Sequence, residues 1–127
     1  MDVIVDPLYE DSIVIDTCAP LASVKDHYKN FINGRLTAIG ATVFPVTGYL
    51  PETIKGIAQW YDRINGDERL MQILTVEDFY MAKKENKLGI ILCFQGTNHI
   101  QSDLSFLEVY YRLGIRQILL CYNRRNA

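Results

Sequence analysis

The segment 88–94, Leu-Gly-Ile-Ile-Leu-Cys-Phe, is the feature that most constrains the fold. A strand with one solvated face alternates apolar and polar residues, whereas this segment is apolar at odd and even positions alike. Such a segment is typical of a parallel strand that is covered on both faces. Parallel strands need long crossover connections, so the segment predicts a sheet with helices packed against it.

Strand-like and helix-like patterns alternate along the whole chain. Pro51 suits the first turn of a helix, and Thr75 with Asp78 forms a capping-box pattern at the start of another. The expected helices are 22–32, 51–64, 75–86 and 102–114. The expected strands are 12–15, 41–46, 70–74, 88–94 and 116–121. Five successive strand–helix units predict an α/β protein.

Two architectures fit this order. One is a five-stranded doubly wound sheet, which suits a chain of 127 residues. The other is a partial (β/α)8 barrel covering about strands one to five, because a complete barrel takes about 250 residues. No linker or low-complexity tract interrupts residues 1–127, so either architecture is expected to form a single α/β segment.

Composition excludes several classes of protein. The 13 basic and 15 acidic residues leave no positive excess for nucleic acid, and no apolar run reaches the roughly 20 residues that span a bilayer. The start lacks the basic region of a secretory signal. The three cysteines are far apart and odd in number, which favours a reducing compartment over a disulfide framework. We therefore expect a cytoplasmic protein with no nucleic-acid or membrane partner.

In both architectures the chemistry is expected where strands end and helices begin. The polar residues at these ends include Asp16 and Cys18 after the first strand, Gln95 and Gly96 after the fourth, and Tyr122 after the fifth. The doubly wound alternative, a flavodoxin-like small-ligand module, would need a glycine-rich phosphate loop or a dinucleotide motif, and the sequence has neither.

The segment from Gly89 to Gly96, the pair Asp103-Leu104 and the run from Tyr110 to Arg116 resemble the membrane (renal) dipeptidase family of the amidohydrolase superfamily. That family has an apolar strand ending Glu-Gly-Gly, a helix with Asp-Leu, and a tyrosine-rich turn ending Leu-Gly-x-Arg. Residues 14–21 are similar to its first motif, Ile-Asp-Gly-His-x-Asp-Leu. The resemblance implies the N-terminal part of a barrel that hydrolyses dipeptides with metal-activated water.

The departures from the family fall on its zinc ligands. Cys18 stands at the position of the histidine, Pro20 at that of the aspartate, and Gln95 at that of the bridging glutamate. Tyr122 replaces a histidine in the motif after the last strand. Zinc needs anionic or imidazole ligands, so we expect no cofactor, with Cys18 the one candidate zinc ligand.

The candidate catalytic residues are accordingly Cys18, Gln95 and Tyr122, and the candidate substrate-binding residues are Asp16, Gly96 and Asn123. Each has a structural alternative. Cys18 could simply pack at a strand end, Gln95 could satisfy nearby backbone groups, and Asp16 could cap the turn that follows it.

The remaining candidates are expected to be structural. Cys93 and Cys121 fall within apolar strands and should lie in the core, where Trp60 is also expected to pack. His27 should be a surface residue, and His99 should be a solvated loop residue.

An incomplete barrel would expose strand edges and apolar faces. We therefore expect a complementary chain or a second copy to supply the remaining strands. The predicted function is hydrolysis of a dipeptide or related small amide with an altered or lost binuclear zinc site. The alternatives are a non-catalytic dipeptidase homologue that binds or assembles, and the flavodoxin-like module.

Overall fold

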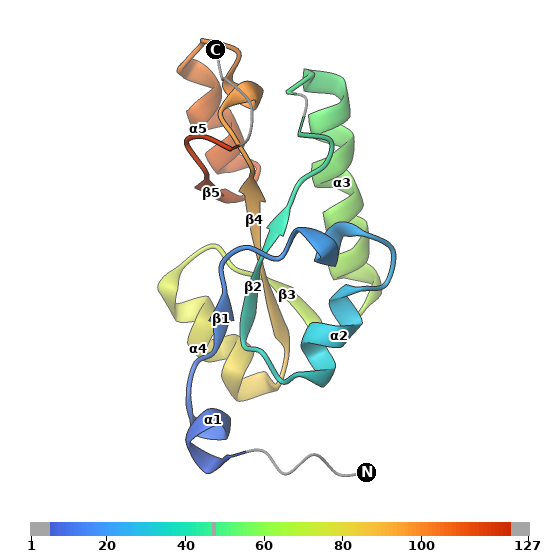
Figure 1. The fold of residues 1–127 in the computed structure, drawn as a ribbon, viewed down its shortest axis with the longest axis vertical. Helices are drawn as coiled ribbons and strands as arrows, with labels where there is room; N and C mark the ends of the chain where they lie inside the picture. Colours follow the sequence, from blue (N-terminus) through green and yellow to red (C-terminus); the bar gives the residue numbers. More distant parts are fainter. Residues whose placement is uncertain (1–5, 47, 123–127) are drawn as a thin grey trace.

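A single sheet of five parallel strands forms the centre of the molecule (Figure 1). The computed structural model describes residues 6–46 and 48–122. The strands are β1 (Ile15–Asp16), β2 (Ala38–Thr42), β3 (Leu70–Gln72), β4 (Leu88–Phe94) and β5 (Ile115–Ile118). Every residue of β4 is buried, which confirms the two-sided covering predicted from its apolar sequence.

The order of the strands assigns the architecture. β1 lies at one edge beside β2, and β2 pairs with β4. The other edge of β4 carries two strands, β3 along Leu88–Ile90 and β5 along Leu92–Phe94. A doubly wound sheet keeps its first strand in the interior, whereas β1 here lies at the edge. β1 pairs with β2 and β4 pairs with β5, as successive strands do in a barrel, and only β4, which lies between β2 and β3, departs from chain order. The chain is thus α/β with a parallel sheet that forms part of a (β/α)8-type barrel.

The helices connect the strands and cover the sheet. Two predicted helices are confirmed, 51–64 as part of α3 (Leu50–Gly66) and 75–86 as α4 (Val76–Glu85), which begins with the expected capping box of Thr75 and Asp78. The helices are α1 (Pro7–Asp11), α2 (Tyr28–Asn33), α3 (Leu50–Gly66), α4 (Val76–Glu85) and α5 (Ser105–Arg112), with 3-10 turns η1 (Pro20–Ser23) and η2 (Asn98–Ile100).

Several predicted elements have different bounds. The first strand lies at 15–16 rather than 12–15, the third at 70–72 rather than 70–74, and the last helix at 105–112 rather than 102–114. The expected helix 22–32 is divided, because the chain takes a left-handed conformation at Lys25 between η1 and α2. The second strand lies at 38–42 rather than 41–46, and its last residue, Thr42, pairs with Cys93. The last strand ends at Ile118 rather than at 121, and the backbone N–H of Leu119 still donates to the carbonyl oxygen of Phe94 at 2.9 Å.

The two faces of the sheet bury different clusters. Alternate residues of β2 and β4 pack against α2, α3 and α5, where Trp60 is almost fully buried as expected. The opposite face packs Ala38 and Ile91 against Ala82 of α4. Within the described residues no helix is long and apolar enough to cross a membrane.

Candidate functional site

The loop after β1 folds over the face of the sheet at the carboxyl ends of the strands. Gly40 on β2 makes this crossing possible, because a Cβ there would lie 2.3 Å from the carbonyl oxygen of Thr17. The backbone N–H of Ala19 donates to the carbonyl oxygen of Gly40 at 2.9 Å. The loop is thus held against β2, and it carries Cys18 toward β4.

The crossing brings two of the predicted catalytic residues together. The side-chain Nε2 of Gln95 lies 3.7 Å from the Sγ of Cys18, at the carboxyl end of β4. Cys18 is exposed and Gln95 is half-buried. Asp16 accepts the backbone N–H of Cys18 at 2.9 Å, so the expected turn cap is present. The role of Asp16 toward a substrate stays a prediction.

A row of polar side chains lies beside this pair. Thr42 on β2, Cys93 on β4 and Gln117 on β5 are register neighbours across the sheet. The Oγ1 of Thr42 lies 3.9 Å from the Sγ of Cys93. Gln117 donates from Nε2 to the carbonyl oxygen of Thr17 at 3.0 Å, so it joins β5 to the loop after β1.

Sequence reasoning missed this row. Thr42 falls within the expected strand 41–46 and Gln117 within the expected strand 116–121, so neither is a predicted site residue. The available signal was that both are polar residues in short strands, at positions where a parallel sheet places side chains on one face.

The cluster formed by Cys18, Gln95, Thr42, Cys93 and Gln117 is largely uncharged. Burial raises the pKa of the Cys93 thiol to about 11, so it remains protonated near neutral pH. Gln95, Gln117 and Thr42 carry no charge. The nearby carboxylate of Asp16 accepts a hydrogen bond from the backbone N–H of Cys18. The described part of the chain has no group of three or more His, Cys, Asp or Glu residues that could hold a metal ion. Cys93 lies in the core, as predicted.

The other predicted site residues are placed less tightly. Gly96 is buried directly after Gln95, with a φ of 135° that favours glycine. Tyr122 is exposed, and among the described residues no hydrogen bond joins it to Cys18 or Gln95. Asn123 lies outside the described residues. The prediction that Cys121 is a core residue is wrong, because the chain has already left β5 and the thiol is exposed.

The prediction that His99 is solvated is also wrong. His99 is 1% exposed, and its ring stacks on Phe94 with the ring centroids 4.0 Å apart. The Thr53 hydroxyl donates to the carbonyl oxygen of Tyr49 at 2.8 Å, so its oxygen is free to accept from the His99 Nδ1–H at 2.9 Å. His27 is exposed, as expected.

This arrangement fixes the state of the His99 imidazole. Its Nε2 is buried and has no hydrogen-bond partner among the described residues. Burial lowers the pKa of His99 to about 4, so the ring is neutral near pH 7. His99 lies in the layer between β4 and the helices, where Tyr110 of α5 donates to its carbonyl oxygen. The signal that could have found it is Thr53, a polar residue on the apolar face of α3.

Comparison with known proteins places this chain in a family. Residues 50–127, more than half of the chain, match the membrane dipeptidase family (Peptidase family M19). The search among curated proteins gave no match.

Solved structures share the fold. An amidohydrolase from Pseudomonas aeruginosa is 27% identical with a TM-score of 0.79, and the match covers 94% of this chain and 37% of that one. The probable dipeptidase PvdM from the same organism is 22% identical with a TM-score of 0.67, again over 94% and 37%. Dipeptidase AC, a metallopeptidase of family M19, is 14% identical with a TM-score of 0.68, over 89% and 44%.

This chain therefore spans less than half the length of each of these three solved structures. The family resemblance seen in the sequence is confirmed by the matched residues and by the shared fold. The chain belongs to the membrane dipeptidase family, Peptidase family M19.

Proposed function

We propose that this chain is the N-terminal part of a dipeptidase-like amidohydrolase that acts on a dipeptide or related small amide through an altered site. The contact between Cys18 and Gln95 at 3.7 Å carries the proposal. These residues come from two strands whose carboxyl ends are where (β/α)8 enzymes hold their chemistry.

The residues present do not fit the binuclear zinc site that the family implies. A bridging ligand between two cations should be anionic, whereas Gln95 is a neutral amide. Cys18 could offer one thiolate, but Pro20 offers no ligand atom. The proposed reaction therefore does not use zinc at these positions.

The chemistry available to this chain is amide recognition. The Gln95 side chain can donate to a substrate carbonyl and accept from a substrate N–H. Its present donor contact is to sulfur, a weak acceptor, so a substrate carbonyl would replace that contact with a stronger hydrogen bond. Gln117 and Gly40 would keep the Cys18 loop in place while Gln95 changes partners.

The site is proposed to be completed by further barrel strands, from a complementary chain or a second copy. β5 pairs with β4 along one edge, and no described strand pairs with its other edge. Nearby apolar side chains are exposed: Leu104, Leu107, Tyr111 and Leu120. Parallel sheets are almost always buried, so this end of the sheet favours a partner. The three cysteines are free, which supports the proposed cytoplasmic location.

A second candidate is a non-catalytic homologue that binds or assembles. The observation in its favour is that the cluster around Cys18 and Gln95 is largely uncharged and that the described residues there include no group of three or more His, Cys, Asp or Glu. Such a protein would bind an amide through the same residues without hydrolysing it.

The test is a dipeptide hydrolysis assay on this chain together with whatever completes the barrel, with metal content measured on the same sample. We expect hydrolysis that resists chelators and falls at least about tenfold in Gln95→Leu, since each 1.4 kcal/mol of lost binding is tenfold. Gln59→Leu, an exposed position on α3, is the matched control. Stoichiometric zinc that is needed for activity would contradict the altered site, and dipeptide binding without turnover would favour the second candidate.

A further inference from the structure

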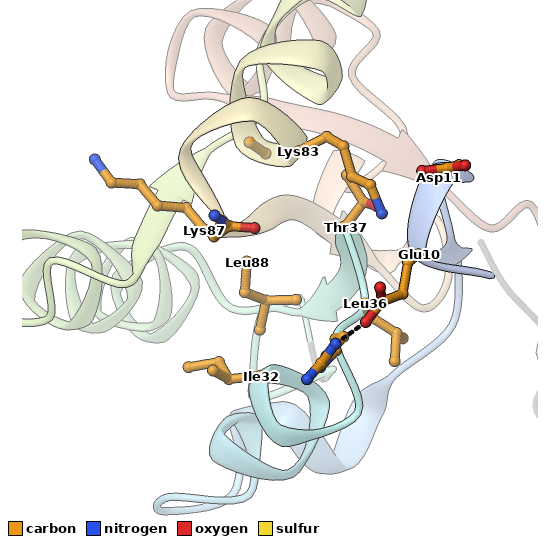
Figure 2. Close-up of a pocket in the computed structure, with 11 residues that line it drawn as sticks. Glu10, Asp11, Ile32, Leu36, Thr37, Lys83, Lys87 and Leu88 are labelled. Atoms are coloured by element: carbon orange, nitrogen blue, oxygen red, sulfur yellow. Dashed lines mark hydrogen bonds and ion pairs between the residues drawn. The ribbon is translucent and has the colours of Figure 1, made fainter. Parts of the chain in front are cut away.

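A pocket lies at the opposite ends of the strands from the candidate site. It has a volume of about 530 Å³, within the usual range for small-molecule sites. Its walls come from α1, from the turn after α2 and from the end of α4, around the first residues of β2 and β4. Figure 2 shows Ile32, Leu36 and Leu88 on one side of the pocket, with Lys83 entering from the α4 side and Asp11 from α1.

The floor of the pocket is fixed by the sheet. Leu88 and Thr37 are each 2% exposed. The Thr37 hydroxyl accepts a hydrogen bond from the backbone N–H of Val14 at 3.0 Å. The Thr37 carbonyl oxygen accepts one from the backbone N–H of Gly89 at 2.8 Å. Ile32 and Leu36 are half-buried beside this floor, and they offer a preformed apolar surface.

The α1 wall is held by polar contacts. None of the residues of α1 is buried. The Tyr9 hydroxyl donates to the carbonyl oxygen of Gly34 at 2.8 Å, and Glu10 forms an ion pair with Arg35. These contacts hold α1 against the pocket, so that Asp11, its last residue, is part of the lining.

Two opposite charges on the pocket wall remain unmatched. Arg35 pairs with Glu10, and Lys87 pairs with Glu85 at 2.9 Å. Within residues 6–46 and 48–122, by contrast, neither Lys83 nor Asp11 forms an ion pair or a side-chain hydrogen bond. The pocket therefore presents one ammonium group, one carboxylate and an apolar floor.

We propose that this pocket binds a free α-amino acid with an apolar side chain. The carboxylate of the ligand would pair with Lys83, its ammonium group with Asp11, and its side chain would cover Ile32, Leu36 and Leu88. With Glu10 paired to Arg35, a simple anion would meet the carboxylate of Asp11, and a simple cation would meet the ammonium of Lys83. A zwitterion satisfies both charges at once. The proposal rests on this pocket alone and is independent of hydrolysis at the candidate site.

The test is a titration of the full chain with L-leucine. Calorimetry measures the affinity, and the NMR shifts of residues around the pocket show where the ligand binds. The comparison ligands are 4-methylpentanoate, which lacks the ammonium group, and 3-methylbutylamine, which lacks the carboxylate. We expect L-leucine to bind at least about tenfold more tightly than either one, since a hydrogen bond to a charged group contributes about 1.5–3 kcal/mol.

Variants then assign the two charges. Lys83→Met and Asp11→Asn should each weaken L-leucine binding about tenfold or more. Lys84→Met and Asp62→Asn are matched controls at exposed positions away from the pocket lining, and they should leave the affinity unchanged. Thermal unfolding checks that each variant is folded, and the comparison ligands test the unmodified protein in any case. Equal binding of the three ligands, equal losses in the controls, or no binding of L-leucine at about 10 mM would overturn the proposal.

Discussion

The side-chain amide of Gln95 lies 3.7 Å from the Sγ of Cys18, although 77 positions separate the two residues in the sequence. The contact requires the loop after β1 to pass directly over β2. Gly40 is the residue that allows this passage, since a Cβ there would lie 2.3 Å from the backbone oxygen of Thr17. The geometry of the candidate site therefore depends on a residue that has no side chain.

Gly40→Ala should separate Cys18 from Gln95. Because the clashing atom belongs to the backbone, the loop must move, and the free energy of unfolding should fall by about 1–3 kcal/mol. Urea unfolding measures the loss, and the labelling rate of Cys18 in a Cys121→Ser background reports the displaced loop. Gly66→Ala is the control, because a Cβ at Gly66 meets nothing within 4 Å. Equal stability and labelling in both variants would show that Gly40 does not position the loop.

His99 should make the protein sensitive to mild acid. The folded state holds its pKa at about 4 against an ordinary value of 6.5. As the pH falls below about 6.5, the unfolded chain takes up a proton that the folded chain refuses, so the free energy of unfolding decreases. The decrease continues to about pH 4 and amounts to about 3 kcal/mol in full.

The measurement is urea unfolding of the wild type and of His99→Gln between about pH 7 and pH 4. Other acid-sensitive groups act in both proteins, so the difference in slope isolates His99. Parallel stability curves for the two proteins would refute the prediction.

The three thiols should react in two classes. Cys18 and Cys121 are exposed and should react quickly with an aromatic disulfide reagent. Cys93 is buried, and its pKa of about 11 leaves almost no thiolate near neutral pH. We expect two fast equivalents from the folded protein and a third on unfolding. A third fast equivalent without denaturant would contradict the burial of Cys93.

Arg116 should stabilise the end of the sheet through its planar guanidinium. Its Nε donates to the carbonyl oxygen of Leu74 at 2.9 Å, and its Nη1 donates to that of Tyr111 at 2.6 Å. Lysine cannot reproduce this fork, so Arg116→Lys should lower the free energy of unfolding by about 1–2 kcal/mol. Arg112→Lys, which alters an exposed ion pair with Glu108, should change it by less than about 0.5 kcal/mol. Similar losses of unfolding free energy in the two variants would rule out this role of the Arg116 guanidinium.

Local patterns in the sequence predicted the elements that depend on local chemistry. The apolar run of β4 and the capping box at Thr75 both appear where expected. The general rule that parallel strands align their carboxyl ends was enough to bring Cys18 and Gln95 to one edge.

The remaining parts depend on register, which the sequence alone does not reveal. The position of Gln117 beside Cys93 follows a register irregularity between β4 and β5, and the burial of His99 depends on Thr53, 46 positions away. The expected helix 22–32 failed for a related reason. Its apolar spacing is helical, but the chain turns at Lys25, and just before that turn the Ser23 hydroxyl donates to the carbonyl oxygen of Thr42 on β2.

The hydrogen bond from Gln117 to Thr17 joins positions 100 residues apart. Contacts of such long sequence separation form late, because the entropy of closing the loop must be overcome first. During synthesis, the loop that carries Cys18 would leave the ribosome well before β5 does. The candidate site would then be among the last parts of this chain to become ordered, after the sheet beneath it has formed.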